Sequence, residues 1–257
     1  MGWPRRLILV RHAESEGNVM SVEERTKWER SSHEYRLTKR GRNQANLTGE
    51  YLKKQFRCGF DAYYSSYYIR SRETLSIMFP EAKVIEDSRL AEAQRGIWHA
   101  MSEEEIAKVF PHEIEFKKRE GLYHHRPLGG ENWPDIEMRI HSFRNTLACE
   151  HESEQVLVIV HGNWHSLFRR VNDGLSVEEV MKRYSLDNRG VVENASVTIY
   201  EGRSVDGKPR LVLKEENIVP WEDGLCDNCY GRGEVLERDE DGERVEKCFK
   251  CKETGLK

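Results

Sequence analysis

Basic and acidic side chains follow four apolar segments of this 257-residue sequence. They share the ability to bind or react with phosphate, and they are Arg11, His12, Arg70, Glu92 and His161, the last of which is followed by Gly162. A guanidinium matches the oxygens of a phosphate, a neutral imidazole can act as a nucleophile near pH 7, and a carboxyl group can protonate a leaving group. The set therefore indicates phosphoryl transfer, in which catalysis is mainly positioning and charge stabilisation.

A parallel sheet would bring these residues together. Residues 7–10 and 156–160 are continuous apolar runs, which are typical of strands buried on both faces. Segments 62–64 and 84–85 are weaker strand candidates. Ligands bind beyond the carboxyl ends of such strands, so we expect one rim of the sheet to collect two histidines, two arginines and a carboxylate.

Predicted helices lie between the strand candidates. They are recognised either by capping signals or by apolar residues at helical spacing. These patterns occupy residues 38–57, 102–105, 135–149 and 176–179. Two later strands are expected at 196–201 and 210–214, around a turn that contains Gly207. The alternation of strands and helices predicts an α/β fold built in layers.

The run Leu9-Val10-Arg11-His12-Ala13-Glu14-Ser15-Glu16-Gly17-Asn18 resembles a signature of the histidine phosphatase superfamily, L-V-R-H-[GA]-E-S-x-x-N. This superfamily includes the cofactor-dependent phosphoglycerate mutases. Further motifs of the superfamily follow in the same order within residues 5–200: Leu37-Thr38-x-x-Gly41-x-x-Gln44-Ala45, Ser65-Ser66-x-x-x-Arg70-x-x-x-Thr74, Leu90-x-Glu92-x-x-x-Gly96-x-Trp98, Pro127-x-Gly129-Gly130-Glu131 and Val160-His161-Gly162. Six motifs in order make chance an unsatisfactory explanation.

The resemblance implies a three-layer α/β/α sandwich with a mostly parallel central sheet, which we expect in residues 1–217. It also implies that His12 attacks phosphorus, that Glu92 donates the proton to the leaving group, and that catalysis requires no cofactor. The implied phosphate-binding residues are Arg11, Asn18, Arg70 and His161. Gly162 lets the backbone come close to the phosphate at the start of a helix, where free N–H groups favour an anion. Glu86 and Glu131 are competing candidates for the acid.

The loop after Glu92 departs from the mutase branch, which typically has Glu-Arg-x-Tyr-Gly where this sequence has Glu92-Ala93-Gln94-Arg95-Gly96. A mutase must also keep phosphohistidine from water, and the sequence identifies no basic residues for that enclosure. We therefore expect a phosphatase whose phosphomonoester substrate is a small metabolite or a phosphoprotein. The alternatives are a mutase-type phosphotransferase and a protein that binds a phosphorylated ligand without turnover.

Four of the six cysteines form two C-x-x-C pairs: Cys226, Cys229, Cys248 and Cys251. The 18 residues between the pairs suit a structural zinc ion held by four thiolates, with iron or a redox dithiol as alternatives. Segments 234–238 and 243–247 predict a β-hairpin around Asp241-Gly242, which gives a zinc-ribbon-like picture. We call residues 225–257 the cysteine module, and we expect residues 218–257 to comprise a linker followed by this module.

The first cysteine pair, with Gly231 and Gly233 behind it, also resembles the C-x-x-C-x-G-x-G repeats of J-domain chaperone zinc regions. So short a segment has too little apolar content to fold without a cross-link, which favours a bound metal ion. A closed site with four protein ligands has no open position for catalysis. We therefore expect a role in stability, in dimerisation or in binding a protein partner.

The composition is that of a globular protein outside the membrane, with 37% hydrophobic residues, 33% charged residues and a net charge of −4. The apolar runs are too short for a membrane span or a signal-peptide core. A balanced charge gives no argument for binding nucleic acid. We expect a cytoplasmic protein, in which paired cysteines favour metal over disulfides.

Overall fold

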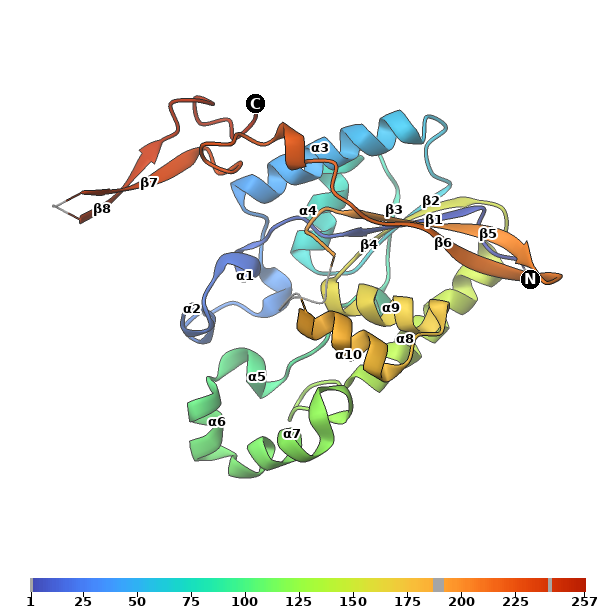
Figure 1. The fold of residues 1–257 in the computed structure, drawn as a ribbon, viewed down its shortest axis with the longest axis horizontal. Coiled ribbons are helices and arrows are strands. Elements are labelled where there is room, and N and C mark those ends of the chain that lie inside the picture. Colours follow the sequence, from blue (N-terminus) through green and yellow to red (C-terminus); the bar gives the residue numbers. More distant parts are fainter. Residues whose placement is uncertain (1, 187–191, 240–241) are drawn as a thin grey trace.

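The computed structural model describes residues 2–186, 192–239 and 242–257, and a six-stranded sheet lies at its centre (Figure 1). The strands are β1 (Arg6–Arg11), β2 (Ala62–Ser65), β3 (Val84–Glu86), β4 (Gln155–Val160), β5 (Val197–Val205) and β6 (Lys208–Ile218). Their order in the sheet is β3-β2-β4-β1-β5-β6. The first four strands pair in parallel, and β5 is antiparallel to both β1 and β6. The sheet is therefore mostly parallel, as the sequence predicts.

The continuous apolar runs of β1 and β4 reflect burial on both faces of the sheet. Leu7 and Leu9 pack in one hydrophobic core, whereas Ile8 and Val10 pack in a second core on the opposite face. Successive side chains of a strand point to opposite faces, so a strand with helices on both sides has no polar face. Both predicted strands are confirmed.

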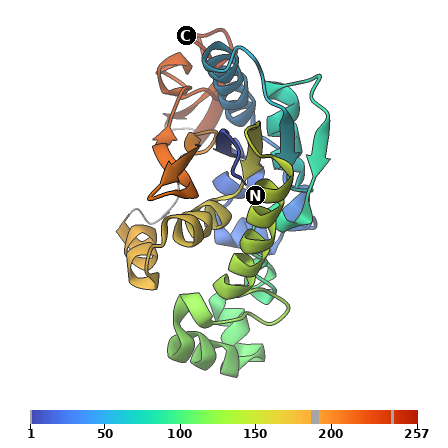
Figure 2. The same ribbon diagram turned by 90° about the vertical axis from the view of Figure 1, so that its right-hand side faces the viewer.

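Helices cover both faces and complete the predicted three-layer sandwich (Figures 1 and 2). One layer contains α3 (Lys39–Gln55) and α4 (Ile69–Met78), and the other contains α8 (Trp133–Glu150), α9 (Gly162–Asp173) and α10 (Val177–Leu186). The predicted caps are present, because Thr38, Ser102 and Ser176 each accept a hydrogen bond from a backbone N–H three residues later.

The remaining α-helices gather at the end of the sheet where β1 ends (Figure 1). They are α1 (Glu16–Val19), α2 (Val22–Thr26), α5 (Ile97–Ala100), α6 (Glu103–Val109) and α7 (Pro111–His124), with the 3-10 helices η1 (Ser32–Glu34) and η2 (Ser88–Leu90). Figure 2 shows that α5, α6 and α7 extend away from the sheet. Within the described ranges, no helix is both long enough and apolar enough to cross a membrane.

The two late strands are longer than predicted, because β5 and β6 continue as a paired ribbon whose outer residues are exposed and carry no apolar alternation. Residues 218–224, which were expected to be a linker, pack against the rest of the fold. This segment contains the end of β6 and the 3-10 helix η3 (Glu222–Gly224), and the Trp221 ring is buried in the core beneath α3. The 217/218 boundary thus lies inside β6 and stays a prediction.

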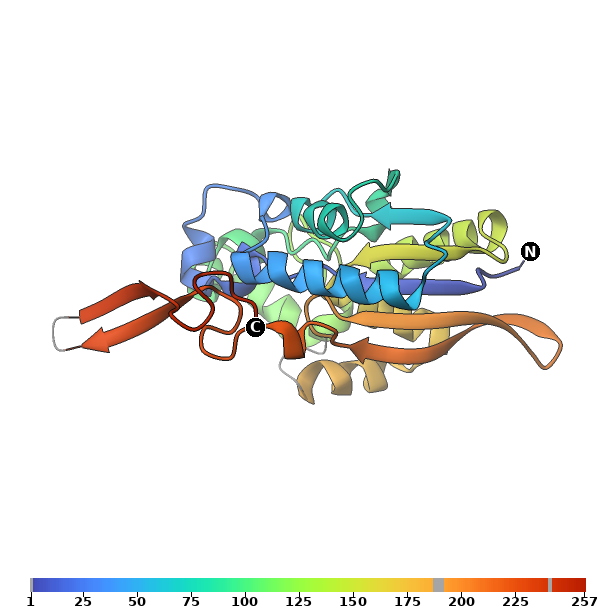
Figure 3. The ribbon, with the colours of Figure 1, turned by 90° about the horizontal axis from the view of Figure 1, so that it is seen from above.

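The cysteine module contains the predicted hairpin, formed by β7 (Glu234–Asp239) and β8 (Gly242–Lys247). Asp241, in the expected turn, lies outside the described residues. Figure 3 shows the coiled part of the module beside α3, with the hairpin projecting beyond it.

Candidate active site and cysteine cluster

A cavity of about 640 Å³ lies at the carboxyl ends of β1 and β4. Six of the predicted site residues line it: Arg11, His12, Asn18, Arg70, Glu92 and Gly162. They come from the end of β1, from α1, from the first turns of α4 and α9, and from the loop after η2. The seventh, His161, is fully buried behind the cavity, where it contacts Arg70. The expected rim of the sheet does bring the predicted residues together.

His12 is held as a neutral imidazole with a defined tautomer. Its Nδ1 lies 2.8 Å from the backbone oxygen of Ala13, and a carbonyl oxygen only accepts, so Nδ1 carries the proton. Burial, with the nearby guanidiniums of Arg70 and Arg11, holds the pKa of His12 well below its usual value. The Nε2 atom therefore presents a lone pair, as a nucleophile requires.

Arg70 joins the two histidines of the site. Its Nε lies 3.1 Å from Nε2 of His12, and its Nη2 lies 3.2 Å from Nδ1 of His161. A guanidinium only donates, so both imidazole nitrogens are acceptors here. Nε2 of His161 then donates to the Ser66 hydroxyl at 2.7 Å. The ring of Tyr68 lies 4.3 Å from the Arg70 guanidinium, which gives the cation an apolar wall.

In this part of the site the arginines are charged and the histidines are neutral. Burial lowers the pKa of Arg70 to about 10, which still leaves the guanidinium protonated at neutral pH. The pKa of His161 lies well below its usual value, first because of burial and then because of Arg70. Arg11 is oriented by a 2.7 Å hydrogen bond to the backbone oxygen of Val192. Two cations beside two neutral imidazoles suit a phosphate.

The loop after His12 is fixed from below by α3. An added Cβ at Gly41 would lie 2.0 Å from the backbone oxygen of Glu14, so the helix and the loop approach as closely as only glycine permits. The Glu14 carboxylate binds Arg40 and the hydroxyl of Thr38. Asn18 accepts from the Ser15 backbone N–H at 3.0 Å, so its amide holds the turn as well as lining the cavity.

Glu92 is the one of the three candidate acids that lines the cavity. Its two carboxylate oxygens accept from the backbone N–H groups of Ala93, at 2.9 Å, and Asn163, at 3.3 Å. Glu131 is bound to Arg139 at 2.9 Å, and Glu86 is an exposed residue of β3. The geometry therefore favours Glu92 over both alternatives.

Further basic residues line the mouth of the cavity, and sequence reasoning did not find them: Arg25, Arg95, His99 and Arg232. Arg95 had a local signal, because it lies in the same loop as Glu92. Arg25 comes from α2 and Arg232 from the cysteine module, so their arrival depends on packing between distant segments.

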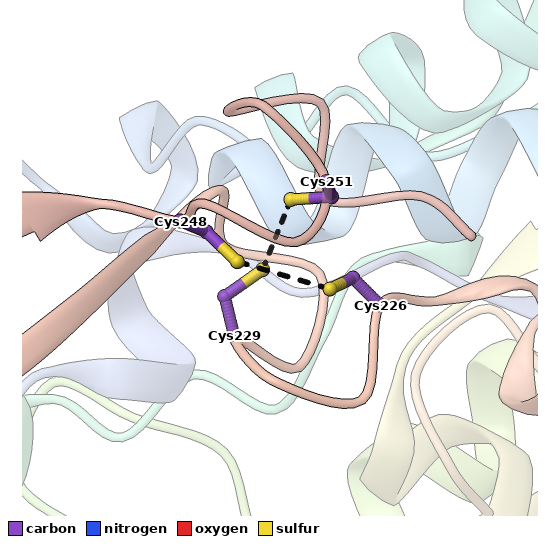
Figure 4. Close-up of side chains that lie close together, drawn as sticks. All are labelled: Cys226, Cys229, Cys248 and Cys251. Carbon is purple, nitrogen blue, oxygen red and sulfur yellow. Dashed lines mark hydrogen bonds between the residues drawn. The ribbon is translucent and has the colours of Figure 1, made fainter.

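The four predicted metal ligands converge, as Figure 4 shows, with all their sulfur atoms within 4.8 Å of one another. The sulfurs of Cys226 and Cys248 are 3.9 Å apart, and those of Cys229 and Cys251 are 3.6 Å apart. A tetrahedral zinc ion with Zn–S bonds of about 2.3 Å would separate its ligands by about 3.8 Å.

The surroundings of the sulfurs also suit thiolates. Backbone N–H groups of Gly233 and Gly255 donate to Cys229 and Cys251, each at 3.2 Å. The side-chain amide of Asn228 donates to Cys248 at 3.3 Å. These donors stabilise negative sulfur, so the cluster fits a metal ion bound by four cysteines.

A family model for the histidine phosphatase superfamily, branch 1, matches residues 7–213. The chain belongs to the histidine phosphatase superfamily. The matched region carries the whole predicted phosphate site and ends before the cysteine module.

Relatives of this histidine phosphatase chain include both phosphatases and mutases. Phosphoserine phosphatase 1 of Hydrogenobacter thermophilus is 29% identical over 169 residues, which cover 61% of this chain and 70% of the relative. The 2,3-bisphosphoglycerate-dependent phosphoglycerate mutase of Nitrobacter hamburgensis is 30% identical over 204 residues, which cover 76% and 95% of the two chains.

Solved structures share the fold. The alpha-ribazole phosphatase of Shigella flexneri has a TM-score of 0.64 at 21% identity, and the match covers 83% of this chain and 98% of that chain. A mycobacterial glucosyl-3-phosphoglycerate phosphatase, in complex with inorganic phosphate, has a TM-score of 0.59 at 22% identity, with coverage of 84% and 98%.

Proposed function

We propose that the protein is a phosphatase that hydrolyses phosphomonoesters through a phosphohistidine at His12. The observation that carries the proposal is the bond from Nδ1 of His12 to the Ala13 oxygen, which leaves Nε2 unprotonated beside the Arg70 guanidinium. A buried neutral nucleophile beside fixed cations is suited to attack a phosphoryl group, whose oxygens need positive charge around them.

The reaction proceeds in two steps. Phosphoryl oxygens take the donors of Arg11 and Arg70, and the bond from Arg70 to His12 is released. Nε2 then forms a bond to phosphorus while the ester P–O bond breaks, and Glu92 gives its proton to the departing oxygen. In the second step Glu92 takes a proton from water, the water oxygen attacks phosphorus, and the P–N bond breaks to release phosphate and neutral His12.

A carboxyl group must be protonated to act in the first step. The negative charge of a bound phosphoryl group favours the protonated form of a neighbouring carboxyl group. This charge is present only when substrate is bound. Glu92 therefore alternates between acid and base within one catalytic cycle. We expect the substrate to be a small phosphorylated metabolite, a class that includes the compounds named for the relatives.

A phosphoglycerate-mutase-type transfer is the second candidate. Arg25, Arg95 and Arg232 at the cavity mouth are the kind of basic residues that would retain an intermediate while it reorients. The acid loop from Glu92 to Gly96 lacks the mutase pattern and favours hydrolysis.

The decisive experiment measures phosphate release from a panel of phosphomonoesters by wild type, His12→Ala and the exposed-residue control His141→Ala. We expect His12→Ala to lose turnover by at least about 1000-fold and to form no acid-labile, alkali-stable phosphoenzyme, with the control unchanged. Hydrolysis that persists in His12→Ala would refute the mechanism. Adding 3-phosphoglycerate as acceptor separates transfer from hydrolysis, because a mutase would move the phosphoryl group faster than water takes it.

The cysteine cluster is proposed to hold a structural zinc ion through Cys226, Cys229, Cys248 and Cys251. A bound ion would supply folding free energy to a segment whose apolar side chains, such as Leu236, Val245 and Phe249, are largely exposed. A closed site of four thiolates leaves no ligand position for the reaction at His12.

A further inference from the structure

The cysteine module is attached to the same helix that supports the nucleophile loop. The side-chain amide of Asn43 on α3 donates to the backbone oxygens of Gly231, at 3.2 Å, and Thr254, at 2.9 Å. Leu225 is buried in the core with residues of α3. An added Cβ at Gly255 would lie 2.6 Å from the amide nitrogen of Asn43. The module is therefore packed against α3 rather than tethered beside it.

Arg232 is presented by a turn that the cysteines hold in place. Its backbone N–H donates to the Cys229 oxygen at 3.0 Å, and the next N–H, from Gly233, donates to the Cys229 sulfur at 3.2 Å. Gly231 and Gly233 both have positive φ, at 83° and 81°, which glycine adopts without strain. The turn directs Arg232 to the wall of the cavity that contains His12.

The cavity wall is richer in positive than in negative charge, with six arginines and three glutamates. Arg40 is neutralised by Glu14, and Arg11 and Arg70 belong to the phosphate site. Within the described part of the chain, the guanidiniums of Arg25, Arg95 and Arg232 contact no carboxylate. By contrast, the surface residues Arg36 and Arg42 of the same region both pair with Glu73.

Cations left without carboxylate partners around one opening favour an anion there. In the proposed reaction the transferred phosphoryl group is bound by Arg11 and the buried Arg70, whereas Arg232 is exposed. A substrate that also reaches Arg232 would bind best with a second acidic group, either a carboxylate or a phosphate, because a guanidinium pairs most strongly with these anions. A cavity of about 640 Å³ accommodates a small molecule of this kind.

We propose that Arg232 of the cysteine module binds a second anionic group of the substrate, so that the module is part of the substrate-binding site. This inference rests on the proposed phosphatase function. It assigns the module a role in specificity, beyond the roles in stability or partner binding that the sequence indicates. The phosphate site and the acid lie outside the module, so Arg232 affects which phosphomonoester is bound.

The test uses hexylphosphonate and hexane-1,6-diyl bisphosphonate, which differ only in the second anionic group and cannot be hydrolysed. Their dissociation constants are measured by calorimetry on wild type, Arg232→Ala, and Arg244→Ala, which removes an exposed arginine from β8 of the same module. We expect wild type and Arg244→Ala to prefer the bisphosphonate about 10-fold, a factor in keeping with one charge-assisted hydrogen bond at an exposed rim.

In Arg232→Ala the preference should fall to within about twofold, while hexylphosphonate binding stays unchanged. Arg232→Glu should reverse the preference, and salt should weaken it in wild type. A wild type with no preference, or an Arg232→Ala protein that retains it, would overturn the inference while the proposed function stands. Failure of hexylphosphonate to compete with inorganic phosphate would instead remove the proposed function, and this inference with it.

Metal removal provides a second test of the same inference. Treatment with a chelator should abolish the preference for the bisphosphonate, because the turn that carries Arg232 is held by Cys229. Hexylphosphonate binding should persist. Retention of the preference by metal-free, folded protein would contradict the dependence of Arg232 on the cluster.

Discussion

Burial of His165 should make folding stability decline in mild acid. His165 is 2% exposed on α9, and its Nε2 lies 3.0 Å from the Thr198 hydroxyl. Burial lowers its pKa to about 3; the guanidiniums of Arg169 and Arg183 act in the same direction, and Glu216 opposes them. His12 and His161 have lowered pKa values for the same first reason, so all three histidines should act together.

The direction and the size of this loss of stability follow from proton linkage. An unfolded histidine has a pKa of about 6.5, so between that pH and the folded pKa of His165 only the unfolded state binds the proton. The free energy of unfolding is therefore highest above pH 6.5 and falls by about 1.4 kcal/mol per pH unit below it. At pH 4.5 the loss through His165 alone is about 2.7 kcal/mol, a large share of the 5–15 kcal/mol that is typical of folded proteins.

The assay compares wild type, His165→Gln and the surface variant His141→Gln by urea unfolding between pH 7 and pH 4.5, in buffer without phosphate. Glutamine keeps an amide donor for Thr198 but does not titrate. We expect the loss of unfolding free energy across this pH range to be smaller by about 2.5 kcal/mol in His165→Gln than in the other two proteins. Equal losses in all three would refute the assignment of acid lability to this buried histidine.

Two further predictions concern the acid and the metal. Glu92→Gln should lower kcat by at least about 100-fold for an alkyl phosphate and far less for p-nitrophenyl phosphate, whose leaving group needs no proton; equal losses would exclude Glu92 as the acid. The purified protein should contain about one zinc ion per chain by elemental analysis, and Cys248→Ser should lower both the zinc content and the melting temperature, whereas Cys149→Ser, at an exposed cysteine, should change neither.

The sequence predicted those parts of the fold that have local signals. Continuous apolar runs marked β1 and β4, because helices cover both of their faces. Capping residues such as Thr38 marked where helices begin. The lengths of β5 and β6 were underestimated, because their outer halves pair with each other in solvent and show no apolar pattern.

The candidate site was predictable where residues come from the ends of strands. Arg11, Arg70 and Glu92 each follow a strand candidate, so the sheet determines their meeting. The basic mouth of the cavity was not predictable, because Arg232 reaches it through the docking of two segments far apart in the chain. Such docking depends on surface fit between folded parts, which residue spacing does not encode.

The helix α3 contacts the nucleophile loop on one side and the cysteine module on another. Gly41 lies against Glu14, while the side chain of Asn43 donates to two backbone oxygens of the module. Because Gly41 and Asn43 lie two residues apart on one helix, the contact with the module does not compete with the contact that supports the nucleophile loop. Among relatives that lack such a module, position 43 should therefore vary freely, whereas a glycine should persist at position 41.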